Sequence, residues 1–170
     1  MRPIRVVPVG EVERDLAGAV CAALAHELRT RCHIAAPVPN AAFAHHPERN
    51  QYHSTAILEH LARFNGDGIV VGVTALDLYI PILTFVFGEA QLGGTCAVVS
   101  SHRLTQEFYG LPADRALLRE RLAKVAIHEA GHTSGLTHCD DYDCVMAASH
   151  SVEWLDLKGA AMCCECRKSV

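Results

Sequence analysis

The sequence predicts an α/β fold whose mixed, mostly parallel, twisted sheet ends in an antiparallel edge strand. Three short apolar runs in the first half alternate with two amphipathic segments, the order typical of parallel strands joined by crossover helices. Two later apolar runs stand close together across a short glycine-rich segment, which favours neighbouring strands. A long helix then carries a histidine motif near position 128.

The first half of the chain accounts for the parallel part of the sheet. Apolar runs at 5–9, 32–36 and 69–74 have the length and bounding residues of buried strands. Segments 11–30 and 51–64 carry apolar residues at helical spacing with charged residues opposite them. We therefore expect two helices that pack on the sheet.

The middle of the chain breaks this alternation. Strand-like runs at 83–87 and 95–100 are separated by GEAQLGG, so one of them is expected at an edge of the sheet. An edge strand near Gly88 to Thr95 would leave backbone groups free to pair with an extended peptide. A purely structural edge strand is the alternative.

Length and composition exclude several classes of protein. A chain of 170 residues, 50% of them hydrophobic, suits one compact domain, and we expect a monomer. The net charge of −4, without a run of Lys or Arg, argues against nucleic acid or an anionic membrane as partner. The chain shows no signal-peptide pattern and no uncharged apolar stretch long enough to span a bilayer, so a cytoplasmic location is expected.

The helix predicted from Pro112 to about Gly135 carries two histidines that are placed to share one metal ion. His128 and His132 are four residues apart, so they project from the helix only about 40° apart and one turn from each other. Zinc suits such a pair, because a catalytic zinc takes three protein ligands and keeps a fourth position for water. This segment is therefore the expected active-site helix.

The residues after the first histidine complete the motif His-Glu-x-x-His-x-x-Gly-x-x-His. Glu129 would accept a proton from the zinc-bound water as general base. Gly135 permits the positive φ that ends the helix and turns the chain, so that His138 can supply the third ligand. Met146 follows where a tight turn would place it beneath the metal. The eleven-residue motif is far more specific than its first five residues alone.

This motif together with Met146 resembles the metzincin clan of zinc peptidases, and its continuation is similar to the archaemetzincins in particular. The continuation has the form Cys-x4-Cys-x-Met followed later by Cys-x2-Cys, and its residues are Cys139, Cys144, Met146, Cys163 and Cys166. The resemblance covers roughly residues 69–167. It implies a metzincin-like α+β domain with an active-site helix, a Met-turn and a short C-terminal helix.

The clustered cysteines indicate a second, structural zinc. Two pairs of thiolates make the Cys₄ set of a closed zinc site, with the members Cys139, Cys144, Cys163 and Cys166. The resemblance favours Cys163, although a shift of one residue would let Cys164 bind instead. A disulfide between Cys139 and Cys144 is disfavoured in a reducing compartment, and a redox Cys-x-x-Cys is disfavoured at a chain end.

The expected single domain has two parts, and the second zinc would hold the C-terminal part in place. Residues 1 to about 135 would hold the sheet and the helices up to the active-site helix, and about 136–170 would be the part that the zinc fastens. A helix at about 151–161 is too short to be stable alone, and the zinc would fix it under the active site. Cys21, Cys32 and Cys96 are expected to be small buried apolar residues.

The expected function is hydrolysis of peptide bonds by a zinc metallopeptidase that binds two zinc ions per chain, one catalytic and one structural. Peptide or protein would be the substrate, and cleavage within a chain or from its end both remain open. A zinc-stabilised peptide-binding or regulatory protein with little activity is the main alternative. A zinc scaffold whose Cys₄ site serves as a partner interface is another. The pattern assigns no place to His102 and His150: solvated or hydrogen-bonded histidines are the favoured interpretation, and a position at the border of the cleft is the alternative.

Overall fold

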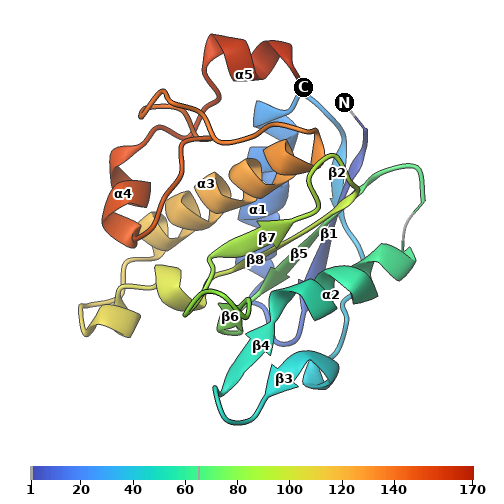
Figure 1. Ribbon diagram of the computed structural model, residues 1–170, viewed down its shortest axis with the longest axis vertical. Helices are drawn as coiled ribbons and strands as arrows, with labels where there is room; N and C mark the ends of the chain where they lie inside the picture. The colour runs from blue at the N-terminus through green and yellow to red at the C-terminus, as the bar shows by residue number, and fades with distance from the viewer. Residues whose placement is uncertain (1, 65) are drawn as a thin grey trace.

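The computed structural model describes residues 2–64 and 66–170. In this part of the chain the main sheet has five strands, four of them parallel and the last antiparallel (Figure 1). In spatial order the strands are β2 (Cys32–Ile34), β1 (Ile4–Val9), β5 (Ile69–Thr74), β8 (Cys96–Ser100) and β7 (Gly88–Ala90). The predicted mixed, mostly parallel sheet with an antiparallel edge strand is confirmed.

Helices cover both faces of this sheet (Figure 1). α1 (Arg14–Glu27) and α3 (Arg115–Thr133) lie on one face, and α2 (Ser54–Leu61) lies on the other. Successive residues of a strand point to opposite faces, so Val71 packs among α1 and α3 while its neighbour Val70 packs among the residues around α2. The molecule is therefore a three-layer α/β/α structure, and α3 carries the histidine motif on one outer layer.

Three expected elements differ from those observed. Residues 83–87 form no strand, and the edge strand begins at Gly88 instead. Residues 51–53 form a short strand instead of the first turn of the expected helix, because Tyr52 pairs with Leu78 of a distant segment. The helix expected at 151–161 is shorter, since Lys158 takes an extended backbone conformation. At Tyr52 a tertiary partner overrides the local pattern.

The remaining elements surround the sheet. A second, smaller sheet contains β3 (His45–His46), β4 (Gln51–His53) and β6 (Leu78–Tyr79). The short 3-10 helices are η1 (Ala42–Ala44), η2 (Ala62–Phe64), η3 (His102–Leu104) and η4 (Glu107–Tyr109). Two short helices end the chain, α4 (Val152–Leu157) and α5 (Cys164–Lys168). None of the helices within residues 2–64 and 66–170 is long and apolar enough to cross a membrane.

Candidate active site and cysteine cluster

Helix α3 is capped at both ends, and this fixes the orientation of its histidines. At its start the Asp114 carboxylate accepts a hydrogen bond from the Leu117 backbone N–H at 2.9 Å. At its end Gly135 has φ 91°, and its N–H donates to the His132 carbonyl at 2.9 Å. The next N–H, of Leu136, reaches back to the Gly131 carbonyl at 3.2 Å, which completes a Schellman motif. The positive φ expected at Gly135 is confirmed.

Past this turn the chain brings the third histidine back to the helix. The ring centroids of His128 and His132 are 4.6 Å apart, and those of His132 and His138 are 5.1 Å apart. One ring nitrogen from each of the three residues lies within 4.8 Å of the others. His128 is buried, whereas His138 is exposed. The three histidines that the motif singled out therefore form one cluster that opens towards solvent.

The hydrogen bonds of the first two histidines determine which nitrogens face each other. His128 Nδ1 donates to the Val145 carbonyl at 2.9 Å, and His132 Nδ1 donates to the Leu136 carbonyl at 2.7 Å. Burial lowers the pKa of His128 to about 3, so its ring is neutral and its Nε2 carries a lone pair. The two Nε2 atoms are 3.1 Å apart. With Nδ1 as the donor in a neutral ring, His128 Nε2 has no proton to share, and a cation between the two nitrogens would bind both lone pairs.

Glu129 lies beside this cluster with little access to solvent. Its side chain packs against Gly88 of β7, where an added Cβ would come within 2.8 Å of Glu129 Cγ. Burial raises the pKa of Glu129 to about 8, the negative charge of Glu89 acts in the same direction, and the Lys158 ammonium opposes both. A dication in the histidine cluster would favour the carboxylate. The group is thus suited to accept and return a proton near neutral pH.

Met146 is fully buried and packs beneath α3. Its sulfur occupies the space in which a side chain at Gly131 would lie, within the histidine motif itself. Met146 therefore contacts the helix that carries His128 and His132, and its role as the floor of the site stays a prediction. Gly131 thus has a packing role that the motif spacing alone did not indicate.

Lys158 is a buried residue of the site that the sequence pattern did not reveal. Its ammonium donates to the carbonyls of Val145 and Ala147, both at 2.8 Å, on either side of Met146. Val145 is also the residue whose carbonyl accepts the His128 N–H. Burial lowers the pKa of Lys158 to about 8. A single lysine between apolar residues carries no motif, so only the folded chain could identify it.

A second cluster lies next to the turn at residues 145–147, which we call the Met-turn. Its four sulfur atoms are within 4.8 Å of one another. Its members are Cys139, Cys144, Cys163 and Cys166. Cys164 is exposed and lies outside it. The Cys144 sulfur accepts backbone N–H groups from Cys163 at 3.2 Å and from Met146 at 3.4 Å.

The chemistry of these thiols fits a bound dication. The backbone N–H of Cys166 lowers the pKa of Cys163 to about 7, whereas burial raises the pKa of Cys166. Four ionised thiolates in so small a volume would repel one another unless a cation held them. A closed set of four sulfurs is the ligand set of structural zinc.

One backbone segment connects the two clusters. The Cys139 N–H donates to the Met146 carbonyl at 3.0 Å, so the segment that carries His138 is hydrogen-bonded to the Met-turn. Cys144, two residues before Met146, belongs to the cysteine cluster. A metal held by the cysteines would therefore hold the third histidine and the floor of the active site in place.

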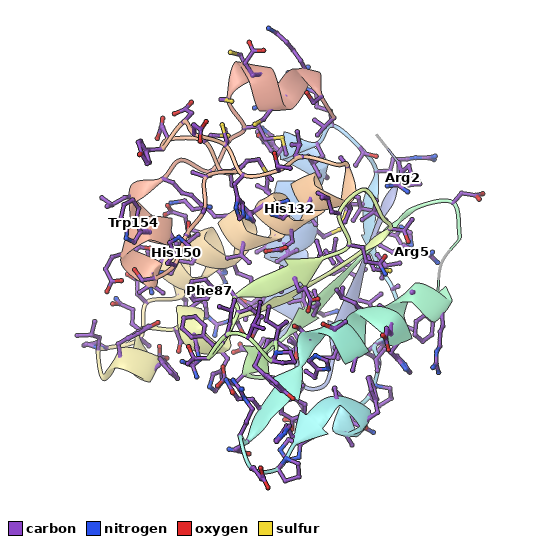
Figure 2. All side chains as sticks on the ribbon, in the orientation of Figure 1. Arg2, Arg5, Phe87, His132, His150 and Trp154 are labelled. Carbon is purple, nitrogen blue, oxygen red and sulfur yellow. The ribbon has the colours of Figure 1, made fainter. Side chains whose placement is uncertain are left out.

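The histidine cluster opens into a cleft of about 440 Å³. Apolar side chains form much of its wall, and they include Leu83, Phe85, Phe87, Val125 and Leu155. His150 also lines the cleft, whereas His102 lines a different cavity. Figure 2 labels Phe87 and His150, both of which line this cleft. The edge strand β7 begins at the rim with Gly88.

Solved structures share this arrangement of the whole chain. A zinc-dependent peptidase from Methanocorpusculum labreanum superposes with a TM-score of 0.89 at 31% identity and covers 98% of each chain. Together with the two clusters, this defines the protein as a zinc metallopeptidase. Residues 18–170 match the description Peptidase family M54. The chain belongs to this family, the family of the archaemetzincins.

Relatives of known name cover nearly the whole chain. The archaemetzincin of Methanocaldococcus jannaschii is 40% identical over 167 residues, which are 98% of this chain and 92% of the relative. The crystal structure of archaemetzincin from Archaeoglobus fulgidus matches with a TM-score of 0.86 at 34% identity and covers 98% of this chain and 99% of that one. The family resemblance first seen from residue 69 onward thus extends through the N-terminal half.

Proposed function

We propose that His128, His132 and His138 hold the catalytic zinc of this peptidase and that Glu129 is its general base. The observation that carries the assignment is the pair of imidazoles whose Nδ1–H groups are engaged by backbone carbonyls, so that their Nε2 atoms face each other at 3.1 Å. Second ring nitrogens held in this way on ligand histidines are typical of a metal site.

The catalytic roles follow from the position of each group. Zinc when bound lowers the pKa of a water molecule and polarises the scissile carbonyl. Glu129 takes the proton of the attacking water and passes it to the leaving amine. Because Glu129 is buried and its carboxylate has little solvent around it, the proton stays in the cleft between these two steps. Lys158 holds the carbonyl that orients His128.

The substrate is a peptide in extended conformation. β7 is the last strand of the main sheet among the described residues, and its start lies at the cleft next to Glu129. Backbone groups at this edge suit pairing with an extended chain. The apolar wall of the cleft suits a large apolar side chain beside the scissile bond.

The second zinc has a structural role in this proposal. Its ligands are Cys139, Cys144, Cys163 and Cys166. Residues 1–170 then act as one domain, because the core joins side chains of α1 and β1 to Cys144 and Cys166. A monomer remains our prediction, and so does a cytoplasmic location, which accords with cysteines kept as thiols or metal ligands.

Replacement of Glu129 by Gln tests the proposal directly. We expect Glu129→Gln to keep both zinc ions by elemental analysis and to cleave a peptide mixture about 10²–10⁴-fold more slowly, since general-base catalysis contributes that factor. Glu59→Gln, at an exposed position of α2, is the matched control and should cleave at the wild-type rate. Full turnover by Glu129→Gln with zinc bound would exclude the assignment.

The same peptide mixture separates the alternatives that the sequence left open. Free and N-terminally acetylated peptides, followed by mass spectrometry, distinguish trimming from internal cleavage by the masses of the products. A zinc-loaded wild-type protein that binds peptides but releases no products would be a binding protein. His132→Ala should lose the catalytic zinc while the cysteine-bound zinc remains.

A further inference from the structure

Two cysteines outside the zinc cluster lie in contact. The sulfur atoms of Cys21 and Cys32 are 2.6 Å apart. This is closer than the 3.8 Å between the sulfur atoms of Cys139 and Cys163 in the cysteine cluster. Both residues are half-buried. The sequence predicted small buried apolar residues, because each of these cysteines stands singly in apolar surroundings. The prediction was wrong in this respect: the two thiols form a pair.

The backbones on both sides of the pair are placed by contacts that do not involve the two sulfurs. Cys21 lies in the middle of α1, whose neighbouring residues Val20 and Leu24 are fully buried in the core. Cys32 begins β2 and stands opposite Ile4 in the ladder with β1. The two sulfurs therefore meet as a result of how helix and strand pack.

The surroundings favour thiol chemistry over metal binding. Among the described residues, the groups of three or more possible metal ligands are the histidine triad and the C-terminal cysteines, and neither Cys21 nor Cys32 belongs to them. Two sulfurs alone do not make a zinc site. A pair of adjacent thiols without a metal has one well-defined reaction, which is oxidation to a disulfide.

We propose that Cys21 and Cys32 form a reversible disulfide when the protein meets a small-molecule disulfide. One thiol attacks the oxidant, forms a mixed disulfide and releases the first small thiol. The second thiol then attacks the bound protein sulfur and releases the other small thiol. The protein loses two hydrogen atoms, and the oxidant is reduced to two thiols. Burial raises the pKa of Cys32 and so lowers the fraction of this thiol that is thiolate at neutral pH.

The bond would fasten one end of the sheet. β2 has three residues and pairs only with β1 among the described strands, so it is an edge that opens readily. A disulfide would tie this edge to α1 and close a short loop. β2 and the active-site strand β7 lie at opposite edges of the sheet (Figure 1). Oxidation should therefore stabilise the protein and leave turnover unchanged.

The test uses zinc-loaded, full-length protein in a Cys164→Ser background. Cys164 is exposed and belongs neither to the cysteine cluster nor to the Cys21–Cys32 pair, so its thiol would otherwise react with the oxidant. The protein is incubated with oxidised glutathione, and its intact mass is measured before and after. We expect a loss of two hydrogens, a non-reduced peptide that links Cys21 to Cys32, and unchanged zinc content. The thermal midpoint should rise by about 5–10 °C, the range expected for a loop of this size, and dithiothreitol should reverse the change.

Control proteins keep the result interpretable. In Cys32→Ser, the oxidant should leave at most a stable glutathione adduct on Cys21, with no rise in thermal midpoint. The wild-type protein should gain an adduct at Cys164, which shows that the oxidant is active. If that adduct forms while Cys21 and Cys32 still alkylate fully, the proposal is overturned. A persistent adduct on Cys21 with Cys32 present, or a link to a cluster cysteine, would overturn it equally.

Discussion

The buried Lys158 gives a sharp prediction about how the active site is supported. Its ammonium donates to the Val145 and Ala147 carbonyls, and the Val145 carbonyl also accepts the His128 N–H. Lys158→Met keeps most of the side-chain length and removes the charge and the donors. The Met-turn then loses the group that holds its two carbonyls together, and His128 loses a fixed acceptor geometry.

The size of the effect follows from these contacts. In Lys158→Met the Val145 carbonyl keeps the His128 N–H, whereas the Ala147 carbonyl loses the lysine donor. A buried acceptor without a partner costs about 1–3 kcal/mol, and part of this is offset because a buried ammonium no longer has to be desolvated. A net decrease of about 1–2 kcal/mol in the free energy of unfolding lowers the thermal midpoint by about 2–8 °C. Loss of a group that orients a metal ligand typically weakens metal binding about 10–100-fold.

Zinc affinity, measured by competition with a chromophoric chelator, is the decisive assay. Lys124→Met is the matched control, since Lys124 is equally buried but donates to the Leu155 carbonyl at 3.2 Å, away from the Met-turn. It should lose stability and keep its zinc affinity. The Lys158 charge lowers the pKa of Glu129, so its removal should move the acidic limb of the pH–rate profile to higher pH. Wild-type zinc affinity together with an unmoved acidic limb in Lys158→Met would refute this reasoning.

Three further substitutions test the packing and the second metal. Gly131→Ala should destabilise the protein by about 1–3 kcal/mol in denaturant titration, because the new methyl group meets the Met146 sulfur. Gly88→Ala should lower turnover with zinc retained, since its Cβ would press on the proposed general base; an unchanged rate would show that β7 shifts freely. Cys144→Ala should bind one zinc instead of two by elemental analysis and lose thermal stability, whereas Cys164→Ala should bind both. Loss of both metals in Cys144→Ala would argue for collapse of the fold rather than two independent sites.

Local patterns predicted the histidine cluster well because each step is short in sequence. The i, i+4 spacing of His128 and His132 is a property of any helix, and the positive φ of Gly135 follows from the need to reverse the chain. The strands at 5–9 and 69–74 were equally clear, since buried parallel strands are continuous apolar runs. Such features depend on neighbours within about ten residues, which the sequence displays directly.

Long-range packing accounts for what the sequence did not predict. Tyr52 joins a strand because Leu78 lies beside it, and residues 83–87 line the cleft instead of joining the sheet. No spacing relates Lys158 to His128, or Cys21 to Cys32, and each pair meets only when separate elements pack.

The sequence by itself determined the class of fold, the histidine and cysteine sets and the chemistry that they support, because these depend on residue type and on spacing within one helix and its turn. The tertiary structure alone decided which ring nitrogens of His128 and His132 face each other, which buried cation donates to the Met-turn carbonyls, and which thiols touch. Those properties depend on distances between segments far apart in the chain, and only the packing of the core sets such distances.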